Sequence, residues 1–271
     1  MTIADRRPNA ADADIDASTS PWPVHTEPNH RRLRVLVGGQ VIADTIASVY
    51  VFEVDHLPVY YFPKSDVRWE YLEHTGHTTH CPRKGDAEYW SIVVGDRRIE
   101  NAVWSYPVPI DGAPDLSQYV AFYWHRVDHW FEEDEEVFVH ARDPYKRVEA
   151  LRSSRHVEVR IDGQLVADTV KPVLLFETGL PTRYYIPMID ICLDLFHASD
   201  TVTACPYKGT ARYMSLRGGG DGGKDIAWVY PTPIPQIPTI ENHVAFFNER
   251  VDISVDGQLQ ERPTTKWSTK R

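Results

Sequence analysis

The stretches RLRVLVGGQVIADT at residues 32–45 and HVEVRIDGQLVADT at residues 156–169 decide the fold, because they are one pattern occurring twice. In each, two runs of alternating apolar residues flank a glycine-containing turn, which is typical of a β-hairpin closed by a primed turn. The similarity extends outward without a gap: residues 31–130 align onto residues 155–254 at a constant offset of 124, with about 35 of the 100 pairs identical. The chain is therefore predicted to hold two copies of one domain.

Further apolar runs within each copy predict more strands. They lie at residues 49–54, 87–92 and 120–124 of the first copy and at residues 173–176, 211–216 and 251–255 of the second. One helical segment per copy is predicted, at residues 65–73 and 189–197, where Asp66 and Asp190 are placed to cap the first turn. The predicted fold class is mainly β, with two homologous small β-rich domains in tandem and about one short helix in each.

The alignment also sets the predicted domain boundaries. Residues 29–132 form the first domain and residues 153–256 the second. Residues 1–28, which lack hydrophobic periodicity, are predicted to be a disordered tail. Residues 133–152 are predicted to be a linker, and residues 257–271 a loosely held C-terminal tail.

Composition excludes several classes of protein. The formal charge of −10 and the pI near 5.6 argue against a nucleic-acid partner, which requires a basic surface. The sequence shows no apolar segment that would span a membrane and no secretory signal, so we expect no membrane partner and a cytoplasmic location. Three cysteines, with Cys81 and Cys205 at equivalent positions of different copies, do not suggest a disulfide framework.

The densest shared string is CPRKGDAEYWSI at residues 81–92 and CPYKGTARYMSL at residues 205–216. It continues into AVWSYPVPI and IAWVYPTPI, and it is preceded by YYFPKSDV and YYIPMIDI. Through these strings the chain resembles, from residue 31 to 256, the tandem form of the domain-of-unknown-function family numbered 427, which is sometimes labelled nucleotidyltransferase-like. The resemblance identifies a family and not a reaction.

The resemblance implies a tent-like β domain, similar to ones that carry a structural zinc on two Cys-x-x-Cys knuckles. Each copy here has one isolated cysteine in its motif, so we predict no metal and no cofactor. A nucleotidyltransferase would hold divalent metal ions on paired carboxylates that follow a Gly-Ser pair. That arrangement is absent from the sequence, which argues against this label on chemical grounds.

Residue types kept in both copies define the candidate ligand-binding site. The candidates are Tyr61, Asp66, Cys81, Lys84, Tyr89 and Trp104 in the first copy and Tyr185, Asp190, Cys205, Lys208, Tyr213 and Trp228 in the second. Tyrosine and tryptophan side chains with one lysine and one aspartate are what a pocket for a small flat or anionic ligand would contain. Glu53 and Glu177, at the ends of apolar strands, are predicted to pair with a lysine or arginine.

Each candidate also has a structural explanation. The aromatic residues would fill a core, the cysteines would be buried thiols, the lysines would be solvated beside a tight turn, and the aspartates would cap helices. The leading functional hypothesis is a module in which each domain binds a small anionic or aromatic metabolite. The alternatives are an enzyme that uses the same pocket for nucleotidyltransferase-like or Cys/Asp/Tyr acid–base chemistry, and a structural scaffold. Catalytic residues, ligand identity and oligomeric state stay open.

Overall fold

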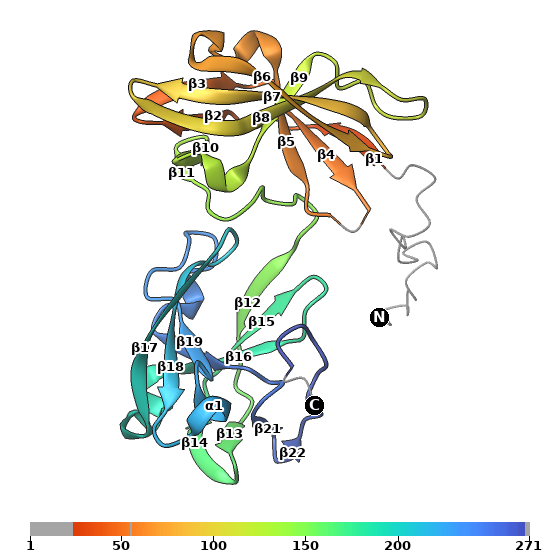
Figure 1. Cartoon of the computed structure of the whole chain (residues 1–271). Coiled ribbons are helices and arrows are strands. Elements are labelled where there is room, and N and C mark those ends of the chain that lie inside the picture. The colour runs from red at the N-terminus through yellow and green to blue at the C-terminus, as the bar shows by residue number, and fades with distance from the viewer. Residues whose placement is uncertain (1–23, 55, 269–271) are drawn as a thin grey trace, which may run out of the picture. The chain divides into compact units, whose positions relative to one another are not determined.

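The computed structural model describes residues 24–54 and 56–268. By its internal contacts the chain divides between Val137 and Phe138 into two units, each holding one copy of the repeat. Each unit contains a seven-stranded and a four-stranded antiparallel sheet (Figure 1). This arrangement confirms the mainly β fold in two tandem domains that the sequence predicted.

The two units have the same strand order. In the first unit the large sheet runs β1 (Val24–Pro28), β4 (Val49–Glu53), β5 (Val59–Pro63), β9 (Tyr119–Phe122), β8 (Arg97–Pro109), β7 (Gly85–Val94) and β6 (Leu72–Cys81), and the small sheet runs β11 (Glu135–Glu136), β10 (His129–Glu132), β2 (Leu33–Val37) and β3 (Gln40–Thr45). In the second unit the large sheet runs β12 (Val148–Arg152), β15 (Val173–Glu177), β16 (Arg183–Pro187), β20 (His243–Phe246), β19 (Ala227–Val229), β18 (Gly209–Leu216) and β17 (Phe196–Cys205). Its small sheet, given in the same direction as that of the first unit, runs β22 (Gln258–Leu259), β21 (Asp252–Val255), β13 (Val157–Ile161) and β14 (Gln164–Thr169).

The hairpins that opened the sequence analysis form as predicted. Strands β2 and β3 pair in the first unit, and β13 and β14 pair in the second. The turn residues Gly38 and Gly39 have φ of +57° and +74°, and Asp162 and Gly163 have φ of +49° and +82°. Positive φ at both central residues matches a type I′ turn, whose twist suits antiparallel strands.

Alternation along the strands separates two hydrophobic clusters in the second unit. Ile186 and Val244 point to the face that packs against the small sheet, which we call the inner face. Tyr185, Ala245 and Trp228 point to the opposite, outer face. Because successive strand residues point to opposite faces, both faces of the large sheet carry apolar side chains. Equivalent residues, among them Tyr61 and Ala121, form the outer-face cluster of the first unit.

The predicted helices are short 3-10 turns. In the first unit they are η2 (Lys64–Asp66) and η3 (Trp69–Tyr71), and in the second η5 (Met188–Asp190) and η6 (Leu193–Leu195). The last residues of each predicted helix belong instead to a strand, β6 or β17. Further helical turns lie outside the predicted segments: η4 (Trp124–Arg126), η7 (Pro238–Ile240) and the one-turn helix α1 (Gly220–Gly223). None of the helical segments in the described part of the chain is long and apolar enough to cross a membrane.

The capping role predicted for Asp66 and Asp190 is wrong. Neither residue makes a side-chain hydrogen bond to the start of its helical turn. The carboxylate of Asp66 instead accepts a hydrogen bond of 2.6 Å from the hydroxyl of Thr45, and that of Asp190 accepts one of 2.7 Å from Thr169. Each aspartate therefore fastens the chain after β5 or β16 to the end of a strand of the small sheet.

Three segments that the sequence analysis left outside the domains contain strands. Residues 24–28 form β1, which pairs with β4, whereas residues 1–23 of the predicted tail lie outside the described residues. The predicted linker contains β11 and β12, and the predicted C-terminal tail begins with β22. These edge strands are held by backbone hydrogen bonds, which need no particular side chains, so the repeat comparison did not reveal them.

Gly85 closes the turn that leads into β7, and a side chain cannot be placed there without strain. Its φ is +104°, and a Cβ atom would lie 2.9 Å from the carbonyl oxygen of Val108. Gly39 also has positive φ, but no atom lies within 4 Å of its Cβ position.

We expect Gly85→Ala to destabilise the first unit by about 1–3 kcal/mol, which is the cost of a non-glycine residue in such a conformation together with the clash. The loss of stability is measured by chemical denaturation, with hydrogen exchange at β5 amides as the readout for the first unit. Gly39→Ala is the matched control and should cost less, because it meets open space. Equal costs for the two variants would show that the contact with Val108 contributes nothing.

Candidate functional site

A hydrogen-bonded tyrosine and tryptophan pair lies on the outer face of each large sheet. The indole Nε1 of Trp104 in β8 donates to the hydroxyl of Tyr61 in β5 over 3.1 Å, and Trp228 donates to Tyr185 over 3.2 Å. The rings meet edge to face, at centroid distances of 6.2 and 6.4 Å. Strand β9 or β20 lies between the paired strands, so the sheet order brings together residues that are 43 positions apart.

A buried ion pair lies near the aromatic residues. The ammonium group of Lys84 donates to the carboxylate of Glu53 at the end of β4, and Lys208 makes the same contact with Glu177. Both lysines are less than one tenth exposed. Burial alone would raise the pKa of Glu53, but the hydrogen bond and charge of Lys84 hold it below its ordinary value. The predicted basic partners of the two glutamates are thus confirmed. Each glutamate also lies near a second cation, at 3.3 Å from Arg83 for Glu53 and at 3.5 Å from Lys146 for Glu177.

A cysteine and a second tyrosine lie beside this pair. Cys81 packs against the outer-face cluster that contains Tyr106, and its thiol is not in a disulfide. Burial, together with the hydrogen bond to Cys81, raises the pKa of Tyr106. Burial likewise raises the pKa of Tyr230, the equivalent residue of the second unit. Both phenols stay protonated near neutral pH and act as hydrogen-bond donors.

Tyr89 and Tyr213 extend the aromatic surface along β7 and β18. Tyr89 shares a hydrogen bond of 2.7 Å with Thr79, and Tyr213 shares one of 2.9 Å with Thr203. Next to them stands Tyr123 in the first unit, with its ring 4.5 Å from that of Trp104. Its side chain is 39% exposed. Burial and a hydrogen bond with Tyr89 raise the pKa of Tyr123 to about 12.

The sequence of each unit matches a known family. A family model described as "Domain of unknown function (DUF427)" matches residues 25–133 and again residues 149–257. The chain belongs to this family. A search of curated proteins finds no significant match. The family matches include β1 and β12, in agreement with the strands that the structure places before each predicted domain start.

In each DUF427 domain the structure brings five of the six candidate residues to the outer face. These are Tyr61, Cys81, Lys84, Tyr89 and Trp104 in the first domain and Tyr185, Cys205, Lys208, Tyr213 and Trp228 in the second. Asp66 and Asp190 are separated from them, because each is bonded to a strand of the small sheet, which packs on the inner face. The carboxylates near the lysines are those of Glu53 and Glu177.

The second DUF427 domain has an additional buried ion pair that the sequence analysis missed. The guanidinium group of Arg183 donates two hydrogen bonds of 2.7 Å to the carboxylate of Glu249, whose side chain has no exposed surface. Arg183 also stacks on the ring of Trp228, with its central carbon 5.7 Å from the centroid. The equivalent residues of the first domain are Val59 and His125, so both charges are absent from the first copy, and residues shared by the copies gave no signal of the pair.

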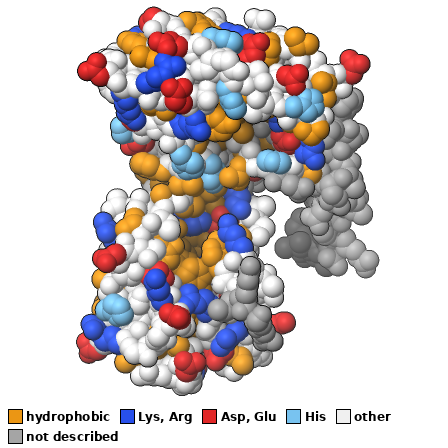
Figure 2. All heavy atoms as spheres, viewed as in Figure 1, with side chains coloured by type: hydrophobic (Ala, Val, Ile, Leu, Met, Phe, Trp, Pro, Cys, Tyr) orange, Lys and Arg blue, Asp and Glu red, His pale blue; other side chains and the backbone are white. Residues whose placement is uncertain are grey.

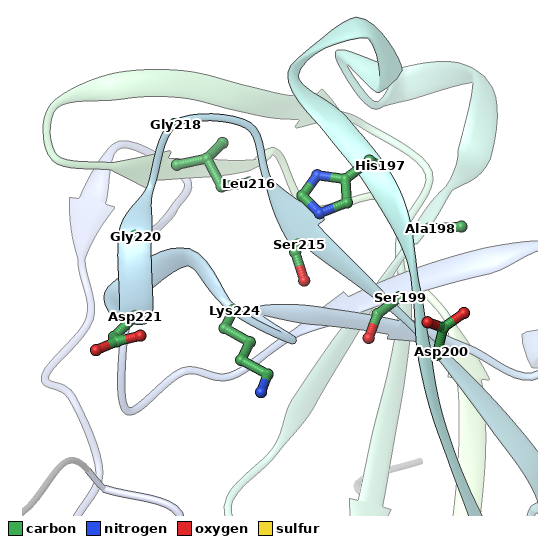
Figure 3. Close-up of a pocket in the computed structure, with 10 residues that line it drawn as sticks. All are labelled: His197, Ala198, Ser199, Asp200, Ser215, Leu216, Gly218, Gly220, Asp221 and Lys224. Atoms are coloured by element: carbon green, nitrogen blue, oxygen red, sulfur yellow. The ribbon is translucent and has the colours of Figure 1, made fainter.

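A hollow of about 480 Å³ lies elsewhere in the second domain, beside the Gly-rich turn that holds α1 (Figure 3). Its lining is made of His197, Ala198, Ser199, Asp200, Ser215, Leu216, Gly218, Gly220, Asp221 and Lys224. Figure 3 shows the polar side chains of Ser199, Asp200 and Lys224 along it. None of the twelve candidate residues lines this hollow. Within the described ranges, no group of three or more His, Cys, Asp or Glu side chains converges to hold a metal ion.

Proposed function

We propose that each DUF427 domain of this chain is a binding module for a small molecule with a flat aromatic ring, which lies against the outer face of the large sheet. The observation that carries this proposal is the repeated outer-face arrangement. The two domains differ at about two thirds of their aligned positions, yet both keep the Trp–Tyr hydrogen bond and the Lys–Glu pair in equivalent places. Figure 2 shows hydrophobic side chains gathered on the visible part of this face in the second domain.

The charges on this face favour an aromatic ligand over a purely anionic one. Lys84 and Lys208 already donate to glutamates, so a ligand anion would have to compete with a carboxylate for either ammonium group. The basic groups next to exposed ring surface are Arg126, which lies 5.0 Å from the ring centroid of Tyr123, and Arg250, 5.7 Å from that of Phe247. A ring that stacks on Tyr123 would place an acidic substituent near Arg126.

The raised pKa values of two outer-face tyrosines argue against a general-base role for them. A tyrosine that acts as a base has to lose its proton near neutral pH, but the pKa of Tyr106 and Tyr230 is raised. Protonated phenols and indole N–H groups are instead suited to orient a bound ligand.

We expect an aromatic carboxylic acid to raise the unfolding midpoint of the protein by a few degrees, because a ligand at 100 times its Kd adds about 2.7 kcal/mol. The measurement is a thermal-shift screen of aromatic acids, nucleotides and sugar phosphates. Tyr123→Ser should reduce the shift, since it removes an exposed ring at small cost in stability.

The matched control is Tyr71→Ser in the same domain. Tyr71 contacts Gln40 of the small sheet through its hydroxyl and therefore lies away from the outer face. If Tyr123→Ser keeps the full shift for every active compound, the outer face of the first domain is not where they bind.

A further inference from the structure

The C-terminal segment, residues 260–268, lies over the outer-face aromatic residues of the second domain. It starts with a backbone hydrogen bond from Gln260 to Ile253 and closes in a turn at Thr265–Ser268. The hydroxyl of Thr265 donates to the carboxylate of Glu249 over 2.6 Å. This segment is therefore fastened to the buried ion pair, in contrast to the loosely held tail predicted from the sequence.

Trp267 is the side chain that this segment places against the aromatic residues. The central carbon of the Arg183 guanidinium lies 5.5 Å from the ring centroid of Trp267 and 5.7 Å from that of Trp228. The ring of Trp267 is also 6.5 Å from the ring of Phe247, which is the counterpart of Tyr123. An indole ring thus occupies the position that a flat ligand would take.

The first domain differs at each of these contacts. The positions of Arg183, Glu249 and Phe247 are taken by Val59, His125 and Tyr123. Tyr123 is 39% exposed and Trp104 is partly exposed, whereas Trp228 is only 8% exposed. The ring surface that is covered in the second domain is accessible in the first.

We propose that Trp267 is an internal occupant of the second domain's outer face, and that the first domain binds the free ligand, an aromatic carboxylic acid. This proposal rests on the proposed function and restricts it: both domains keep the binding face, but a free ligand binds only in the first domain, because Trp267 fills that face in the second. A side chain tethered by a short segment acts at an effective concentration on the order of millimolar, so a free ligand at micromolar levels does not displace it. In the first domain, Val59 and Trp104 offer apolar surface to the ring. Arg126 lies over the ring of Tyr123, where its guanidinium group can receive the carboxylate.

The test uses the full-length chain, with indole-3-acetate as the probe and indole N–H resonances as the readout. In the parent protein the probe should perturb Trp104 and leave Trp228 unchanged, with one equivalent bound. In Trp267→Ala the probe should perturb both residues, with two equivalents bound. Without probe, hydrogen exchange at Trp228 Nε1 should become faster by about tenfold in this variant, as expected for the loss of one stacked ring.

Two further variants guard against indirect effects. Thr265→Ala keeps the Trp267 ring but removes its anchor, so it should raise the affinity of the second domain for the probe without a loss of folding. Trp69→Ala removes another exposed tryptophan, whose indole donates to the backbone of Lys64, and it should leave the stoichiometry at one.

The outcomes separate the two proposals. Unchanged exchange at Trp228 in Trp267→Ala, or perturbation of Trp228 in the parent protein, overturns the role of Trp267. If hydrogen exchange at Trp228 is faster in Trp267→Ala but the probe binds to neither domain, Trp267 does cover Trp228. The ligand class and the proposed function are then both overturned. Binding at Trp104 alone in the parent and at both tryptophans in Trp267→Ala supports the whole proposal.

Discussion

Replacing Arg183 by methionine is expected to lower the free energy of unfolding of the second domain by about 3–5 kcal/mol, the usual cost of breaking a buried ion pair from one side. The side chain of Glu249 is fully buried and accepts two hydrogen bonds from Arg183 and one from Thr265. After the substitution, a carboxylate without its countercharge stays in the interior. No other substitution discussed for this chain leaves a fully buried charge uncompensated.

Native-state hydrogen exchange of β16 and β20 amides measures this loss, with β5 amides of the first domain as an internal reference. The matched control is the double variant Arg183→Met, Glu249→Met, which removes both charges and should recover most of the stability. If the free energy of unfolding of Arg183→Met lies within about 1 kcal/mol of that of the parent, Arg183 is not the partner that keeps Glu249 ionised.

The pH dependence of this pair follows from the lowered pKa of Glu249. Burial opposes ionisation, but the hydrogen bonds from Arg183 and Thr265 outweigh it and hold the pKa of Glu249 below its usual value of 4.5. A carboxyl group with a depressed pKa stabilises the folded state above its unfolded pKa, and this stabilisation is lost as the pH falls through the folded value. The difference between the parent and Arg183→Met should therefore be largest near neutral pH and should shrink below about pH 5, as Glu249 becomes protonated in the variant.

The sequence predicted the strands because their signals are local. Alternating apolar residues and the turn residues at Gly39 and Gly163 are read within a few positions of one another. The repeat then showed the signals of the hairpin and of residues 49–54 and 87–92 a second time, whereas the runs at residues 120–124 and 251–255 are not equivalent positions. Edge strand β1 escaped detection because its pairing with β4 depends on backbone groups, and residues 24–28 share little side-chain pattern with residues 148–152.

The residues of the outer face could also be predicted from the sequence, but which charged residues pair with one another could not. Glu53 contacts Lys84 across 31 positions and Arg183 contacts Glu249 across 66, and both contacts depend on the order of strands in the large sheet. Hydrophobic periodicity does not determine which strands are neighbours. Asp66 was assigned to the site because its residue type is kept in both copies, and a 3-10 turn after β5 directs it instead to Thr45.

Trp228→Ala is expected to cost about 3–5 kcal/mol of the second domain's stability, the range for removing a large buried aromatic side chain. Trp228 is 8% exposed, packs on Phe247 at a centroid distance of 4.7 Å, and lies against the guanidinium group of Arg183. Its loss leaves a cavity and removes one of the two indole rings that enclose that group. Hydrogen exchange at β16 and β20 amides measures this cost as well.

Two comparisons divide this cost into its causes. Trp228→Phe keeps most of the apolar volume but loses the N–H donor to Tyr185, so it should cost about 1–3 kcal/mol. Trp104→Ala makes the same truncation in the first domain, where the indole is partly exposed and no arginine within residues 24–54 and 56–268 stacks on it, so it should cost less than Trp228→Ala. Equal losses for Trp104→Ala and Trp228→Ala would mean that Arg183 and Trp267 add nothing to the packing of Trp228. A larger loss for Trp228→Ala would mean that the second domain uses this tryptophan as part of its core to a greater extent than the first domain uses Trp104.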